Sequence, residues 1–239
     1  MTASTFKLSE IGVLLRGEPA AVRSWADDLS GRRVALHLGV IIAGAGGYGA
    51  AMGWWRAPEQ ALLVAIKFPL IILLTTGGNV LLNAMLAPLL GLNLTFRQTL
   101  LAQLMSCAVT AAILGAFAPI SAFLVWNTPA ISPEAMHSVA YSVMKLAHVA
   151  VIAFAGSAGN ARLLQLLVQL GGRRAVAGRV LFAWLAGNLF LGSQLCWMLR
   201  PFIGAPNLPV EFIRSHLALQ GNFYENVFRT VTGLLSDQP

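Results

Sequence analysis

Acidic residues are scarce in this sequence: Asp and Glu together account for nine of its 239 residues. None of them lies in any of the five long apolar runs described below, so the carboxylate that usually carries proton coupling or hydrolysis inside a membrane is missing there. Charged residues of both signs make up 10% of the chain, whereas a soluble domain carries about 25%. Such a chain has too few polar groups to cover the surface of a soluble domain.

The sequence also lacks the common motifs of catalysis and cofactor binding. It has no Cys-x-x-Cys, no His-Glu-x-x-His, no Gly-x-x-x-x-Gly-Lys and no Gly-x-Ser-x-Gly, and its four histidines are scattered. Its two cysteines, Cys107 and Cys196, lie inside apolar runs. A membrane interior offers neither an oxidant nor stabilisation of a thiolate, so we expect both to pack as small apolar residues. The sequence therefore predicts no metal site, no cofactor and no enzymatic activity.

Five runs that contain almost no charge make up most of the chain. They cover residues 34–55, 61–92, 100–126, 139–160 and 180–199. Each reaches the ~20 apolar residues that a helix needs to cross a hydrocarbon core about 30 Å thick. The runs predict an all-α fold, a polytopic transmembrane helix bundle with about five spans.

The segments before and after these spans carry a different pattern. We expect three regions: an N-terminal segment at 1–33, a transmembrane domain at 34–200 and a tail at 201–239. Apolar residues recur at helical spacing in both flanking segments, which predicts an interfacial amphipathic helix at each end of the chain. Two other roles stay open: a partner-docking helix at the N-terminus and a binding lid in the tail.

Basic residues indicate the orientation of the bundle. Of the 16 Lys and Arg residues, ten lie in the N-terminal segment and in loops on the same side, and four lie on the opposite side. Because basic loops stay in the cytoplasm, this asymmetry predicts a cytoplasmic N-terminus and an exported C-terminus. The net charge of +7 then indicates contact with anionic lipid headgroups and not with nucleic acid. The Ala-rich composition is typical of prokaryotes, so we expect a multi-pass protein of a bacterial inner (plasma) membrane.

Small residues recur at every fourth position of the first run, at Gly39, Ala43, Gly47 and Ala51, and Gly49 and Gly53 add a Gly-x-x-x-Gly. This spacing places them on one helix face, where short side chains let another backbone approach closely. The pattern predicts a packing seam along the first helix. Two partners for the seam stay open: another span of the same chain, and a second protomer of a homo-oligomer.

The second run is too long for a straight crossing, because its 32 residues would extend about 48 Å as a helix. Pro69 predicts a kink within it. Asn79 and Asn83 follow four residues apart. We expect both side chains to point into the bundle, since an amide that faces lipid has no hydrogen-bonding partner.

Two short signals predict helix boundaries. Thr95 and Gln98 have the spacing of a capping box, which predicts the start of the third helix. Gly156 and Gly159 predict that the fourth helix ends or bends there, with a short amphipathic piece at 163–170.

The fourth run carries polar side chains at i, i+4 and i+7, namely Tyr141, Lys145 and His148. The spacing places them on one helix face, and Lys67 of the second run lies at a comparable depth. Two interpretations stay open. Either the lysines extend to the headgroup level while the other side chains hydrogen-bond between helices, or all four line an electropositive outer pocket. Such a pocket would bind an anion, a carboxylate or a phospholipid headgroup.

Two short segments resemble the Yip family, named for Ypt-interacting proteins. Lys67, Phe68 and Pro69 open an apolar run, and residues 94–101 (Leu-Thr-Phe-Arg-Gln-Thr-Leu-Leu) lead into the next, much as a polar turn, a phenylalanine and a basic residue do in bacterial members. The acidic Asp-Leu-Tyr-Gly-Pro type of segment of eukaryotic members is absent, so GTPase binding and vesicle traffic are not implied. The resemblance implies a non-enzymatic helical membrane protein with an organising or accessory role.

We therefore expect a membrane protein that acts through lipid partners, anionic lipids among them, or through protein partners. The rival hypothesis is a small transporter or lipid-handling protein that uses the region of Lys67, Lys145 and His148. The two hypotheses differ in geometry, because the rival requires these side chains to line one shared cavity.

The asymmetry of basic residues yields a topology prediction. Reporter fusions should report a cytoplasmic N-terminus and an exported C-terminus, because an odd number of spans separates the two ends. Fusions that place both ends on the same side of the membrane would rule out five spans.

Overall fold

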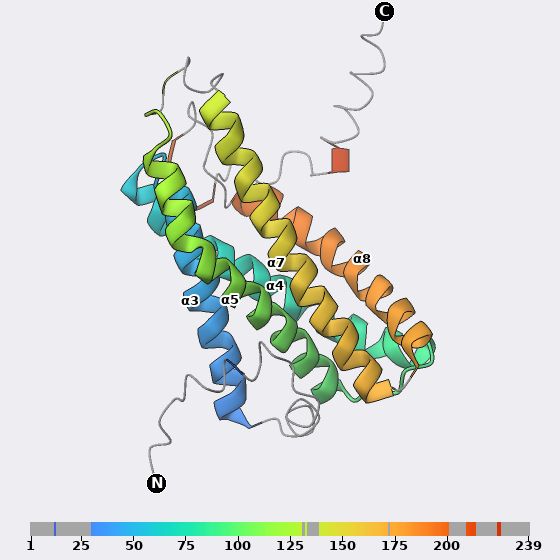
Figure 1. Cartoon of the computed structure of the whole chain (residues 1–239). Coiled ribbons are helices and arrows are strands. Elements are labelled where there is room, and N and C mark those ends of the chain that lie inside the picture. The colour runs from blue at the N-terminus through green and yellow to red at the C-terminus, as the bar shows by residue number, and fades with distance from the viewer. Residues whose placement is uncertain are drawn as a thin grey trace, which may run out of the picture.

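The computed structural model describes Gly12 and residues 30–130, 132, 139–171, 173–200, 209–213 and 224–225. Within these residues the fold consists of five long helices, α3 (Gly31–Gly53), α4 (Pro58–Leu89), α5 (Phe96–Trp126), α7 (Val139–Gly171) and α8 (Arg174–Leu199) (Figure 1). The predicted amphipathic helices of the N-terminal segment and of the tail lie almost wholly outside the described residues.

All five helices are long and apolar enough to cross a membrane. Each covers all or nearly all of one of the five apolar runs, so the prediction of an all-α, five-span bundle is confirmed. A helix satisfies its backbone hydrogen bonds within itself, which is why this architecture suits a medium without water. The chain is therefore a multi-pass helical membrane protein.

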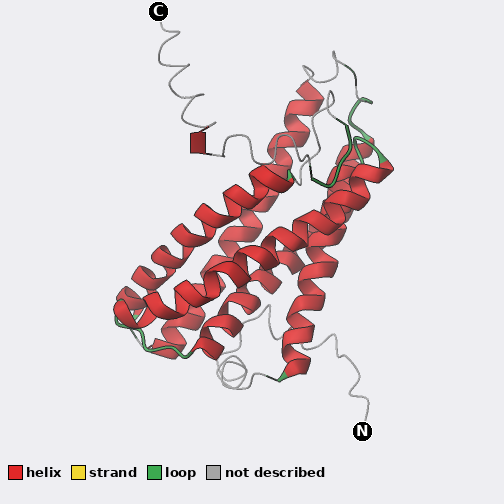
Figure 2. Ribbon diagram, turned by 180° about the vertical axis from the view of Figure 1, so that it is seen from behind, coloured by secondary structure: helices red, strands yellow, loops and turns green. Residues whose placement is uncertain are grey.

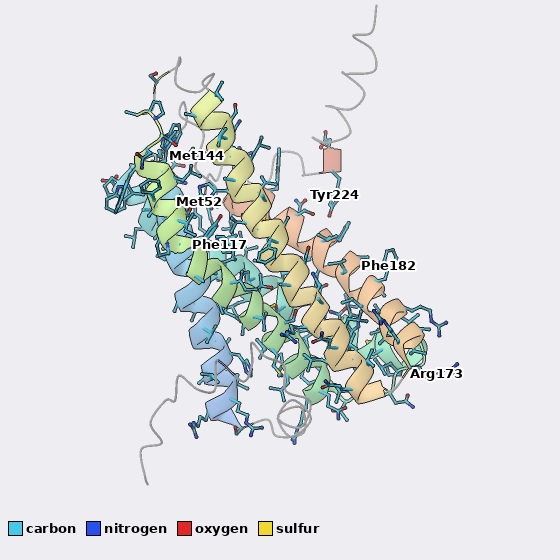
Figure 3. All side chains as sticks on the ribbon, viewed as in Figure 1. Met52, Phe117, Met144, Arg173, Phe182 and Tyr224 are labelled. Carbon is cyan, nitrogen blue, oxygen red and sulfur yellow. The ribbon has the colours of Figure 1, made fainter. Side chains whose placement is uncertain are left out.

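Consecutive helices run in opposite directions and pack as a bundle in which α3 lies against α4 and α5 (Figure 1, Figure 2). α7 packs on α5, and α8 packs on both α4 and α7. One end of the bundle holds the starts of α3, α5 and α8 together with the ends of α4 and α7. We call it the arginine-rich end, because Arg32, Arg97 and Arg173 lie there; Figure 3 labels Arg173 at this end.

Local sequence signals explain where two helices start. Pro58 occupies the first turn of α4, where its missing N–H costs nothing. Thr95 and Gln98 form the predicted capping box at the start of α5: Gln98 N donates to Thr95 Oγ1 over 3.2 Å, and Thr95 N donates to Gln98 Oε1 over 3.1 Å. Helix α4 itself continues through Pro69 without a break.

The predicted end of the fourth helix near Gly156 and Gly159 is wrong, because α7 runs without interruption to Gly171. Gly159 lies against α5 instead: a Cβ added to it would lie 2.9 Å from Ser106 O, and Ser106 Oγ donates to Gly159 O over 2.9 Å. The glycine therefore permits close helix packing and does not terminate the helix. Leu163 and Leu167 beyond it are buried, which extends the packed interface to the end of α7.

The regular series of the predicted seam, at Gly39, Ala43, Gly47 and Ala51, does not face another span of the chain. Gly39, Ala43 and Gly47 are exposed, and Ala51 is half-buried. A Cβ added to Gly39 or Gly47 would meet no atom within 4 Å. The intramolecular alternative is therefore wrong for this face, and packing against a second protomer stays a prediction.

Other glycines of α3 make the close contacts. A Cβ added to Gly115 of α5 would lie 2.9 Å from Gly44 Cα, and one added to Gly44 would collide with the backbone oxygen of Ala111. On another face of α3, a Cβ added to Gly49 would lie 2.7 Å from Val64 O of α4. Missing side chains thus let α3 approach two neighbours at once, which apolar lipid does not otherwise promote.

This packing predicts opposite outcomes at two neighbouring glycines. Gly44→Leu should lower stability in detergent by about 1–3 kcal/mol or more, because the added side chain must push α3 away from α5. Gly47→Leu adds the same volume on the exposed face and should leave thermal stability nearly unchanged. The measurement is the melting temperature of the two variants beside wild type; an equal loss at Gly47 would mean that this face is packed against another molecule.

Candidate functional site

His148 of α7 is buried near the end of the bundle opposite the arginine-rich end, between α3 and α5. Its Nδ1 lies 3.0 Å from the hydroxyl oxygen of Tyr48 and 3.2 Å from Ser121 Oγ. The rings of Tyr48 and His148 meet edge to face, with centroids 5.7 Å apart. Three helices therefore contribute one polar side chain each to a buried cluster.

The donors and acceptors of this cluster do not match one to one. A neutral imidazole Nδ1 makes a single good hydrogen bond, either as donor or as acceptor, so the hydroxyls of Tyr48 and Ser121 compete for it. The other ring nitrogen, Nε2, is buried and has no hydrogen-bond partner among the described residues. The arrangement joins three helices through one imidazole and two hydroxyl groups.

Lys67 of α4 is covered by the tail of the chain. Its side chain is 3% exposed, and its Nζ donates to the backbone oxygen of Glu211 over 2.8 Å. The same Nζ lies 5.4 Å from the centroid of the Phe212 ring, within the range of a cation–π contact. The ammonium is thus held by a backbone carbonyl and an aromatic face of residues 209–213.

The tail makes a second contact on α8, at the end far from Arg173 (Figure 3). The Tyr224 hydroxyl donates to Phe190 O over 2.8 Å and lies 2.7 Å from Ser193 Oγ. The two aromatic rings stack, with centroids 5.2 Å apart. The described residues of the tail therefore bind α4 at one point and α8 at another.

Lys145 lies on the surface of α7 and not beside His148. Its side chain is exposed, with Nζ 4.5 Å from the centroid of the Tyr141 ring. Tyr141 in turn packs on Trp55 of the α3–α4 connection, with ring centroids 5.0 Å apart. Positions 145 and 148 are three residues apart and so point about 60° apart around the helix. This difference is enough to leave Lys145 on the surface while His148 is buried.

Asn79 and Asn83 lie in the interior between α4 and its neighbours. Asn79 Nδ2 donates to Asn188 Oδ1 of α8 over 3.0 Å, and Trp184 Nε1 of α8 donates to Asn83 O over 3.0 Å. These bonds link α4 to α8, and the Nδ2 of Asn83 has no partner among the described residues.

The four predicted binding residues thus occupy three different surroundings. His148 lies in the interior cluster, Lys67 lies under the tail, and Lys145 lies with Tyr141 on the surface. Sequence reasoning missed Tyr48, Ser121 and the tail residues. Tyr48 carried a signal, because a phenol inside an apolar run needs a hydrogen-bond partner. No sequence signal pointed to Glu211 and Phe212, because no local pattern links them to Lys67, which lies 144 positions before Glu211.

Within the described part of the chain, no group of three or more His, Cys, Asp or Glu side chains is placed to hold a metal ion. Cys107 Sγ lies 3.4 Å from Thr76 Oγ1, and neither it nor Cys196 forms a disulfide. No known protein family, curated protein or solved structure matches this chain.

The contact of Lys67 with the tail can be tested by removing its charge. Lys67→Met keeps the apolar stem and deletes a bond from a charged donor, which is worth about 1.5–3 kcal/mol. Amide hydrogen exchange at residues 210–213 should therefore become faster. Lys145→Met is the control and should leave that exchange unchanged, because Lys145 contacts Tyr141 on the surface. Equal exchange in wild type and Lys67→Met would contradict the contact.

Proposed function

We propose that this protein is an accessory or organising protein of the bacterial inner membrane, acting through anionic lipids and protein partners and not as an enzyme. The observation that supports this proposal best is an arginine collar, which we define as Arg32, Arg33, Arg97, Arg173 and Arg174. These side chains come from the start of α3, the start of α5 and the α7–α8 connection. Three separate segments thus bring positive charge to one end of the bundle.

The acidic residues that the structure describes lie away from the collar. The Asp and Glu residues that the structure describes are Glu59, Glu211 and Glu225, and all lie toward the opposite end, near the start of α4 or in the tail. A Lys or Arg near an anionic membrane surface contributes about 1 kcal/mol of attraction. Several of them around one bundle end therefore suit a leaflet rich in anionic lipid.

Orientation and resemblance support the same proposal. Arginine-rich ends stay on the cytoplasmic side, so the collar favours a cytoplasmic N-terminus. The cytoplasmic leaflet carries the negative surface potential that the collar would meet. The resemblance to the Yip family, which rests on residues 67–69 and 94–101, also favours an accessory role.

The rival hypothesis of a small transporter or lipid-handling protein receives less support. It requires Lys67, Lys145 and His148 to line one cavity. Lys67 is instead bound to residues 211 and 212, Lys145 is exposed, and His148 hydrogen-bonds to Tyr48 and Ser121.

The test compares two pairs of charges. The double variant Arg97→Gln/Arg174→Gln removes two exposed arginines of the collar. It should co-purify with a lower ratio of anionic to zwitterionic lipid than wild type. The ratio is measured by mass spectrometry after the protein is extracted from native membranes. Arg56→Gln with Lys145→Gln removes two positive charges at the other end and should retain the wild-type ratio. Loss of anionic lipid in the second pair alone would favour the rival hypothesis and contradict the proposal.

A further inference from the structure

The part of α8 beyond Asn188 is loosely packed. It lies toward the end of the bundle opposite the arginine-rich end, which we call the far end. Trp184 is fully buried, and the next buried residue is Leu199 at the end of the helix, while residues 185–198 are half-buried or exposed. The hydrogen bonds that Trp184 and Asn188 make with α4 lie near the middle of α8. The far part of α8 therefore depends on other contacts to stay in place.

This part of α8 faces α4 along a seam. A Cβ added to Gly192 would lie 3.5 Å from Thr75 Oγ1 of α4. Cys196 follows Gly192 by about one turn, so it lies on the same face of α8, toward α4. On α4, which runs in the opposite direction, Lys67 precedes Thr75 by eight residues and so lies about 12 Å nearer the far end. The seam therefore leads from Thr75 and Gly192 outward to the level of Lys67.

The tail is fixed to both helices that form this seam. On α4, Lys67 Nζ donates to Glu211 O and lies over the ring of Phe212. On α8, the Tyr224 hydroxyl donates to Phe190 O, and the two aromatic rings stack. One continuous stretch of the chain thus joins α4 to α8 in the region where α8 has few core contacts of its own.

The tail holds α8 on the face that points away from α4. Phe190 precedes Gly192 by two residues, which is about 200° around the helix, and its side chain is 66% exposed. A contact on this outer face keeps α8 near α4 only if the other end of the tail is fixed, and that end is bound to Lys67. The two anchors therefore work as a pair.

We propose that the tail residues 209–213 and 224–225 form a latch that keeps the far part of α8 closed on α4. Release of either anchor lets this part of α8 move away and opens the seam at the far end. Segments with few buried contacts open at the lowest free energy, so the far part of α8 moves while the rest of the bundle stays packed. The latch is independent of the arginine collar, which lies at the opposite end, and its tests do not measure lipid binding.

The first experiment measures how fast N-ethylmaleimide alkylates the two native cysteines of the full chain in native membranes, each site being quantified by mass spectrometry. Lys67→Met should speed alkylation of Cys196 about tenfold, because a lost hydrogen bond from a charged donor shifts the closed-to-open equilibrium by at least that factor. Cys107 contacts Thr76 on the α5 side of α4, away from the seam, and should react at the wild-type rate. Lys145→Met is the matched control and should change neither rate.

The second experiment distinguishes a latch from two independent contacts. Tyr224→Ala removes the anchor on α8, yet it should speed amide hydrogen exchange at residues 210–213, which lie at the anchor on α4. The double variant Lys67→Met/Tyr224→Ala should alkylate Cys196 about as fast as Lys67→Met alone, because one lost anchor already frees the latch. Tyr224→Phe keeps the stacked ring and should have a smaller effect. Unchanged alkylation of Cys196 in Lys67→Met, unchanged exchange in Tyr224→Ala, or an equal rise at Cys107 would overturn the proposal.

Discussion

Close backbone contact around α3 is the constraint on which the rest of this bundle depends. Lipid tails are as apolar as the side chains they surround, so helices in a membrane associate through packing and hydrogen bonds. Gly44 against α5 and Gly49 against α4 bring three backbones together, which a larger side chain at either position would prevent. The remaining helices are added to this core, with α7 on α5 and α8 on α4.

Polar contacts then specify how the outer helices are placed. Ser106 bonds to the backbone of Gly159 on α7, His148 joins α7 to α3 and α5, and Asn79 pairs with Asn188 on α8. Each of these groups would be unsatisfied if its helix slid or rotated, because lipid offers no replacement partner. Close packing thus holds the helices together, and a few hydrogen bonds fix their register.

The sequence was sufficient to predict how many helices the protein has. It was not sufficient to predict which face of each helix packs against its neighbours. Apolar length alone determines a span, and the capping box of Thr95 and Gln98 is a local signal, so both could be predicted. The first run contains several overlapping series of small residues. Gly39, Ala43 and Gly47 form the most regular one and are exposed, whereas close contacts are made by Gly49 of the second predicted series and by Gly44, which was not predicted. Periodicity could not choose among these series, because the choice depends on neighbouring helices.

The bond between Lys67 and Glu211 also has a consequence for the order of events during synthesis. These two positions are separated by 144 residues, so the lysine enters the membrane long before its carbonyl partner exists. Until then, its ammonium must reach the interface along its own flexible stem. The growing chain therefore passes through a stage in which α4 is inserted but its charge is still hydrated. The bundle reaches its final arrangement only after the last helix is inserted and residues 209–213 have packed against Lys67.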